Sequence, residues 1–194
     1  QKIRRKKIMK QQKGLSTRAV VATGIGAAVF LILFKFVAIP TGIPNTQINV
    51  AQSWDALITA IFGPIVGALV AFIGHALNDA ISYGSVWWSW VIADAVFALI
   101  FGIAIKRLQL TNGDFSTRKA VLFNVWQLVA NVIAWSIVAP LGDILLFSEP
   151  ATKVFLQGFV ATGVNFVSTL ILGTIILAAY NKTQVKRGSL AKED

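Results

Sequence analysis

Three residues with chemically active side chains lie together in one apolar stretch of the sequence: His75, Asn78 and Asp79. Their i, i+3, i+4 spacing puts all three on one face of a helix. An imidazole, an amide and a carboxylate can hold a polar ligand, and such groups are costly to bury in an apolar segment. We therefore interpret this face as functional. The alternatives are a packed polar pair of His75 and Asp79, and a proton relay that no polar residue continues inward.

Other apolar stretches carry polar and tryptophan side chains at helical spacing. Indole rings can stack on a flat ligand, while amide, imidazole and carboxylate groups can satisfy its heteroatoms. This combination predicts a pocket for a small, flat, polar molecule. The candidate substrate-binding residues are Asn45, Gln52, His75, Asn78, Asp79, Trp87, Trp88, Trp90, Asp94, Gln127, Asn131 and Trp135.

Several of these features also have a purely structural interpretation. The tryptophans between positions 87 and 90 would suit an interfacial aromatic belt. Asn165 is best interpreted as a hydrogen-bonding contact between helices, a role that asparagine and glutamine often have in membranes. Asp55 near a membrane interface would be a solvated helix cap, and Lys35 would extend its ammonium group to the lipid headgroups.

The residue types exclude several kinds of chemistry. The chain has no cysteine and a single histidine, so disulfides, thiolate chemistry and a multi-histidine metal site are excluded. It contains no phosphate-binding P-loop, no HExxH and no GxSxG motif. We therefore expect no enzymatic activity, no cofactor, no metal site and no ATP hydrolysis by this chain itself.

The composition is that of a membrane protein. Of the 194 residues, 56% are hydrophobic and only 13% are charged, and the mean hydropathy is +0.70. A soluble domain usually carries about 25% charged residues. The net charge of +10 could suggest nucleic acid, but the basic residues lie in the two tails and one loop. No basic face interleaved with aromatic residues is present, so we expect contact with lipid and not with nucleic acid.

The apolar segments predict an all-helical integral membrane bundle of six spans. Alternating β-barrel patterning is absent. The bundle domain is expected over residues 16–182, after a basic segment at 1–15 and before a tail at 183–194. We build nothing on residues 1–8, which precede the only methionine and are treated as an upstream or non-native extension. The predicted spans are residues 17–39, 47–62, 64–82, 86–105, 120–138 and 154–180.

Charge distribution decides between six spans and five. The second span is short, and joining it to the third would leave five. With six spans, eight Lys and Arg up to Arg18, four between 106 and 119, and four from Lys182 onward all lie on one side. Five spans would move the last eight of these to the opposite side, against the positive-inside rule. We therefore expect six spans with both termini in the cytoplasm.

This orientation places the polar residues of several spans in the outer half of the membrane. The inner half is mostly Ala, Val, Ile, Leu, Gly and Phe. A continuous polar channel would need polar lining at both ends. We therefore expect a pocket that opens to the outside and closes toward the inside.

Small residues form ridges along the first span. One ridge contains Ala19, Thr23 and Ala27, a second Ala22 and Gly26, and a third Gly24 with Ala28. Small residues spaced by four let another helix approach closely. The partner is either a helix of this same bundle or a helix of another protein.

Three segments carry a resemblance to a known family. They read VAIPTGIPNTQINVAQSWDAL, FGPIVGALVAFIGHALNDA and GSVWWSWVIADAVFALIFGI. The chain from residue 10 to about residue 182 resembles the substrate-binding, or S, component of energy-coupling factor (ECF) transporters. Within that family it resembles the UPF0397-like branch linked to hydroxymethylpyrimidine or vitamin B6.

The resemblance implies a high-affinity capture subunit of an ATP-driven vitamin importer in the bacterial plasma membrane. It implies six helices, a pocket near the external side covered by the loop at residues 40–49, and no catalytic activity. The implied partners are a transmembrane coupling protein and two cytoplasmic ATPases. Pyridoxine or hydroxymethylpyrimidine is the favoured ligand. The residues implied to dock the coupling protein are Ala19, Ala22, Thr23, Gly26 and Ala27.

Two other functions fit the residue pattern. A free-standing proton-coupled transporter of small solutes would use the same polar groups without ATPase partners. A structural or assembly membrane protein would use them only to hold helices together.

Overall fold

The computed structural model describes residues 14–43 and 46–184. Asn45, and most of the predicted basic segment and tail, lie outside the described residues. The proposed boundaries at residues 15 and 183 therefore stay predictions. The helices and strands are α2 (Thr17–Phe36), β1 (Ile39–Pro40), β2 (Gln47–Ile48), α3 (Val50–Phe62), α4 (Pro64–Tyr83), α5 (Trp88–Ile105), α6 (Thr117–Ile133), η1 (Ala134–Val138), α7 (Ala139–Phe147), α8 (Ala151–Ser168), η2 (Thr169–Gly173) and α9 (Thr174–Lys182).

The predicted all-helical membrane bundle is confirmed. Five stretches are long and apolar enough to span a membrane, two of them the continuous helices Thr117–Phe147 and Ala151–Lys182. The sixth, α3, has 13 residues and reaches only about 20 Å at 1.5 Å per residue. It is shorter than predicted because residues 47–48 form a strand that pairs antiparallel with Ile39–Pro40. The same pairing ends α2 at Phe36 rather than at the predicted residue 39.

The fifth helix continues well past its predicted end. The predicted span ends at residue 138, two residues before Pro140, which lacks the N–H that an α-helix needs and usually breaks it. The described chain instead widens into the π-helical turn η1 (Ala134–Val138) and continues through α7 to Phe147. A π-helical turn inside an α-helix accommodates such an interruption and is common at functional sites.

Local sequence signals account for several helix ends. The Ser16 hydroxyl accepts a hydrogen bond from the Ala19 N–H at the start of α2. Asn49 does the same for the Ala51 N–H at the start of α3. Gly63 has a φ of +92°, which a side chain would disfavour, and it lets Pro64 begin α4 immediately after α3 ends.

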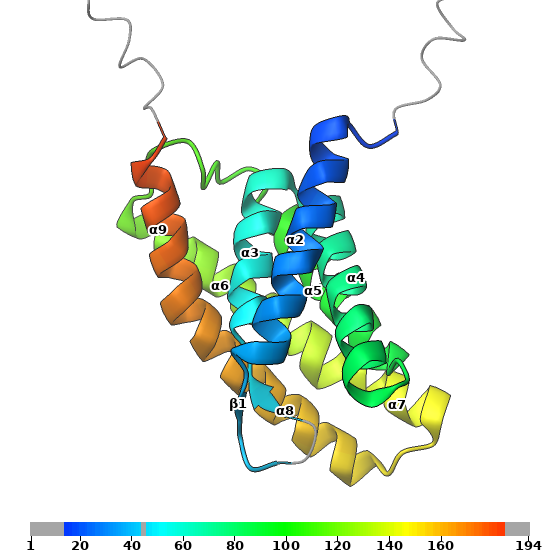
Figure 1. The fold of residues 1–194 in the computed structure, drawn as a ribbon. Coiled ribbons are helices and arrows are strands. Elements are labelled where there is room, and N and C mark those ends of the chain that lie inside the picture. Colours follow the sequence, from blue (N-terminus) through cyan, green and yellow to red (C-terminus); the bar gives the residue numbers. More distant parts are fainter. Residues whose placement is uncertain (1–13, 44–45, 185–194) are drawn as a thin grey trace, which may run out of the picture.

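The three basic regions that the structure describes lie at one end of the bundle. Figure 1 shows the start of α2, the α5–α6 connection and the end of α9 at that end, and the β-hairpin and the α7–α8 turn at the other. These three basic regions therefore lie on the same side of the bundle, as the charge pattern predicts. Which end faces the cytoplasm stays a prediction.

The small-residue ridges of α2 divide between the bundle interior and the surface. Thr23, Gly26 and Ala27 are buried, and the Gly26 carbonyl accepts a hydrogen bond from Trp54 Nε1 of α3 at 3.0 Å. Ala19 and Ala22 pack against the core between α2, α3 and α4. The predicted docking residues therefore pack mainly against helices of this same bundle. This was one of the two partners that the sequence allowed, the other being a helix of another protein. The third ridge, Gly24 and Ala28, is exposed.

Candidate substrate-binding cavity

A cavity of about 640 Å³ opens at the end of the bundle that holds the β-hairpin. Its volume falls in the range typical of small-molecule sites, roughly 300–1,000 Å³. Residues from all six helices and from the hairpin line it. Seven predicted binding residues are among them: Gln52, His75, Asp79, Trp87, Trp90, Asp94 and Trp135.

His75 bridges two carboxylates at the inner side of the cavity. Its Nδ1 lies 2.7 Å from Asp94 Oδ2, and its Nε2 lies 3.6 Å from Asp79 Oδ1. Asp79 is one turn further along α4, whereas Asp94 comes from α5, the helix that packs most extensively on α4. The ring of Phe34 lies over the imidazole with 4.7 Å between ring centres. These contacts hold the His75 ring in one orientation.

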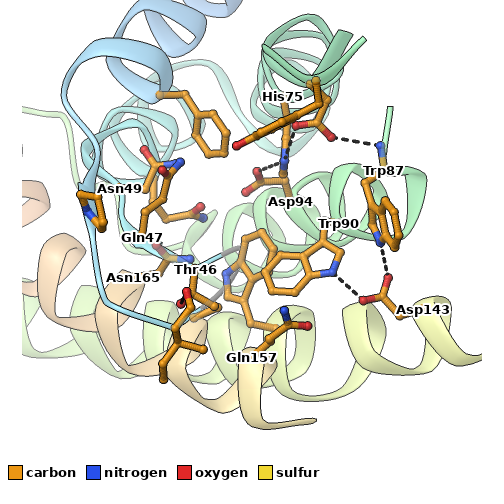
Figure 2. Close-up of a pocket in the computed structure, with 18 of the residues that line it drawn as sticks. Thr46, Gln47, Asn49, His75, Trp87, Trp90, Asp94, Asp143, Gln157 and Asn165 are labelled. Carbon is orange, nitrogen blue, oxygen red and sulfur yellow. Dashed lines mark hydrogen bonds and ion pairs between the residues drawn. The ribbon is translucent and has the colours of Figure 1, made fainter. Parts of the chain in front are cut away.

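Asp143 of α7 organises the aromatic wall. It accepts hydrogen bonds from Trp87 Nε1 at 2.7 Å and from Trp90 Nε1 at 2.8 Å, and the Ser89 hydroxyl also donates to it. Figure 2 shows both indole groups directed at this carboxylate. Trp135, in the π-helical turn η1, lies beside Trp90 with 5.5 Å between ring centres. The aromatic wall of the cavity therefore consists of Trp87, Trp90 and Trp135, and the buried Asp143 carboxylate holds the first two in place.

Four buried polar atoms of lining residues have no hydrogen-bond partner among the described residues. Two are donors, Gln52 Nε2 and Trp135 Nε1, and two are acceptors, Asp94 Oδ1 and Asn165 Oδ1. Buried polar groups in proteins almost always have a partner, because leaving one unpaired is costly. All four atoms lie beneath the cavity surface, so a ligand with acceptors and donors on a flat ring would satisfy them only after these side chains rotate toward it.

Asp55 is one turn inward from Gln52 on α3 and is fully buried. Neither of its carboxylate oxygens has a partner in the described part of the chain. The interpretation of Asp55 as a solvated helix cap is therefore wrong, because α3 begins deeper in the bundle than the sequence suggested.

Four predicted binding residues do not line the cavity. Trp88 is on the outer surface of α5 against Phe72, with its ring centre 5.9 Å away. Asn78 is buried beside the cavity with weak contacts to Asp79 and Ser82. Gln127 and Asn131 bond each other along α6, and Gln127 also donates to the Phe166 carbonyl of α8. These last two residues act as contacts within and between helices.

Sequence reasoning left out several residues that line the cavity. Asn165, interpreted as an interhelical contact, has its Oδ1 unpaired there. Asp143 was overlooked because it follows Pro140, although it is an isolated acidic residue in an otherwise apolar stretch from 135 to 147. The hairpin contributes Thr46, Gln47 and Asn49 across the cavity from Trp90, as Figure 2 shows. Further lining residues are Phe34, Pro40, Gly42, Ile43, Tyr83, Ser85, Glu149, Lys153, Gln157 and Ala161.

The described residues contain no group of three or more His, Cys, Asp or Glu side chains that could hold a metal ion. The arrangement suits binding rather than reaction. It offers stacking surfaces, hydrogen-bond donors and acceptors, and charge.

The chain is similar to known proteins over nearly its whole length. Residues 14–182 match the family model described as "ECF-type riboflavin transporter, S component". A UPF0397 protein of Leuconostoc citreum is 58% identical over 184 residues, which cover 95% of this chain and 98% of the relative. A UPF0397 protein of Staphylococcus aureus strain Newman is 49% identical over 185 residues, covering 95% and 100%.

The fold is similar to that of a solved structure, the S-component for biotin from an ECF-type ABC transporter. The TM-score is 0.65 at 15% sequence identity, and the match covers 90% of this chain and 98% of that one. At this identity the similarity concerns the fold and not the ligand.

Proposed function

The chain belongs to the family of S components of energy-coupling factor transporters, and on that premise we propose that it captures a small aromatic vitamin or vitamin precursor in the cavity described above. It is a multi-pass protein of the bacterial plasma membrane and a transport subunit, not an enzyme. S components of this family work with a coupling protein and two ATPases, which supply the energy of transport.

The cavity itself carries the proposal. It combines an aromatic wall held by Asp143 with four unpaired buried polar atoms. Such a site suits a flat heteroaromatic ring that bears polar substituents. Pyridoxine and hydroxymethylpyrimidine have this form and stay the favoured ligands. Riboflavin, named in the matching family description, is the main alternative. A cavity of about 640 Å³ has room for either a single aromatic ring or the three fused rings of riboflavin.

The orientation in the membrane is part of the same proposal. Both chain termini would face the cytoplasm, and the cavity with its hairpin would face outward. The positive-inside rule supports this orientation, because the described Lys and Arg other than Lys35 and Lys153 lie at the opposite end of the bundle from the cavity.

We propose that α2 contacts the coupling protein through its exposed ridge, Gly24 and Ala28, and not through the five α2 residues named in the sequence analysis. Within the most apolar 18 residues of α2, only 22% are buried in this chain. The corresponding share is 33–50% in the other four long spans. The ridge lies among the exposed apolar residues Val21, Ile25 and Ile32. A helix of the coupling protein could approach most closely where the side chains are smallest.

Direct binding to the purified chain tests the proposed function. We expect saturable binding of one molecule per chain for pyridoxine, hydroxymethylpyrimidine or riboflavin, measured by titration calorimetry in detergent. His75→Ala should weaken this binding by about tenfold or more, since it unpairs Asp94 and Asp79. Asn131→Ala is the matched control: it removes a bond outside the cavity, so it should lower thermal stability and leave affinity unchanged.

Two results would contradict the proposal. One is a folded chain that binds none of these compounds. The other is equal loss of stability in both variants with ligand binding or uptake unaffected, which would favour a structural or assembly protein.

A further inference from the structure

The cavity lining carries more negative than positive charge. Its acidic residues are Asp79, Asp94, Asp143 and Glu149, and Lys153 is its single lysine or arginine. Lys153 is already paired, with its Nζ 2.7 Å from Glu149 Oε2. This pair is near the mouth, at the turn between α7 and α8. The remaining three carboxylates therefore face the ligand space with only His75 to balance them.

The trio of His75, Asp79 and Asp94 is negative in either state of His75 as long as both carboxylates are ionised. It then carries two net negative charges when the imidazole is neutral and one when it is protonated. Asp94 Oδ1 is unpaired among the described residues. Asp143 adds a further negative charge, which its three neutral donors stabilise but do not cancel.

Two of the backbone N–H groups near the cavity that could bind an anion are already occupied by side chains of this chain. Phosphates and carboxylates in proteins are held by arginine, lysine or free N–H groups at helix N-termini. At the start of α5, the Trp87 N–H donates to Asp79 Oδ2 at 3.1 Å. At the start of α3, the Ala51 N–H donates to Asn49 Oδ1 at 2.8 Å. Two helix ends that border the cavity thus point their donors at side chains of this chain.

We infer that the cavity selects the neutral or cationic form of a heteroaromatic vitamin and rejects its anionic derivatives, such as phosphate esters and carboxylic acids. The inference rests on the proposed function and narrows its substrate class. An amino group or protonated ring nitrogen would be attracted by the acidic lining, and after rotation of these side chains it would donate to Asp94 Oδ1 or Asn165 Oδ1. Ring or hydroxyl acceptors would then accept from Gln52 Nε2 or Trp135 Nε1. An added phosphate would meet like charge at the inner side, which costs affinity.

Matched pairs of ligands test the inference on the intact chain. Pyridoxine, hydroxymethylpyrimidine and riboflavin are each compared with their phosphate monoester by titration calorimetry. An uncharged acetate ester of the same hydroxyl controls for size. We expect the phosphate ester to bind at least about 100-fold more weakly than the alcohol, and the acetate ester to bind much closer to the alcohol.

Two variants locate the source of the discrimination. Asp94→Asn keeps the side-chain shape and removes a charge, so the alcohol-to-phosphate ratio should fall about tenfold or more even if absolute affinity also changes. Lys153→Gln removes the single lysine of the lining, and the ratio should not fall. A phosphate ester that binds as tightly as its alcohol would overturn the inference and leave the proposed function standing. Binding of none of the alcohols or esters would overturn the proposed function and this inference with it.

Discussion

Replacing Asp143 with alanine should weaken vitamin binding by at least about 100-fold. The change leaves Trp87 Nε1, Trp90 Nε1 and the Ser89 hydroxyl without their common acceptor. A hydrogen bond to a charged group contributes about 1.5–3 kcal/mol, so without these two bonds the cost of holding both indoles in place falls on ligand binding, where ~2.7 kcal/mol corresponds to 100-fold. The indole rings would then be free to leave the wall on which the ligand stacks. Titration calorimetry on the purified variant measures the effect.

The control for this change is another aspartate outside the cavity. Asp114 is in the connection between α5 and α6, its side chain is 67% exposed, and its contact with Lys119 is a surface ion pair at 3.4 Å. Asp114→Ala should leave affinity unchanged, because exposed ion pairs contribute little. Normal binding by folded Asp143→Ala would show that the aromatic wall does not contact the ligand.

Replacing Gly24 with leucine should prevent assembly with the coupling protein and the ATPases while ligand binding stays normal. Outside Gly24's own stretch of helix, no atom of the described residues lies within 4 Å of a Cβ built on Gly24, so the leucine would project from α2 without disturbing the bundle. It would also hold a partner helix away from the ridge. Overpacking a close contact costs about 1–3 kcal/mol, which predicts a loss of complex of roughly 10- to 100-fold. Copurification of the complex from membranes measures it.

Two other glycines make the docking test specific. Gly163 of α8 is also exposed with nothing within 4 Å of an added Cβ, so Gly163→Leu should assemble normally. Gly26 is buried, and an added Cβ would come within 2.7 Å of Val70 Cγ2. Gly26→Leu should therefore damage the fold and reports nothing on docking. Full assembly by Gly24→Leu would mean that the coupling protein contacts another face.

Hydrophobic run length and charge were sufficient to predict the six helices. A membrane segment must be long and apolar, and its flanking basic residues mark one side, so both signals are local to the sequence. Helical spacing also predicted that His75 and Asp79 share a face of α4. Their partner Asp94 was selected as a candidate residue, but its contact with His75 depends on how α4 and α5 pack, which spacing within one helix does not encode.

Predictions from the sequence were limited in two situations. In one the backbone departs from a regular helix, and in the other the sequence does not show which helix packs against a given helix face. Gln127, Asn131 and Trp135 are spaced by four residues, and all three were predicted to bind the ligand. The π-helical turn η1 begins at Ala134 and changes the direction of the residues that follow. Trp135 therefore lines the cavity while Gln127 and Asn131 face α8 and their own helix. The same turn carries the helix past Pro140 and so places Asp143 against the tryptophans.

The small residues of α2 show why the neighbour of a face cannot be inferred from spacing alone. Ridges at four-residue spacing identify surfaces that can be approached closely, but they do not identify the partner. Thr23, Gly26 and Ala27 face the bundle. Gly24 and Ala28 each follow a buried residue in sequence, about 100° around the helix from it, and are exposed.

Vesicles that contain only this chain provide the most direct test of a capture subunit, as opposed to a complete transporter. Purified chain is reconstituted with and without the coupling protein and ATPases, and radiolabelled vitamin is added outside. We predict binding of at most one vitamin per chain by the chain alone, without accumulation and without response to a proton gradient. With the partners and ATP present, vitamin should accumulate. Accumulation by the chain alone, driven by a proton gradient, would contradict this account and identify a free-standing transporter.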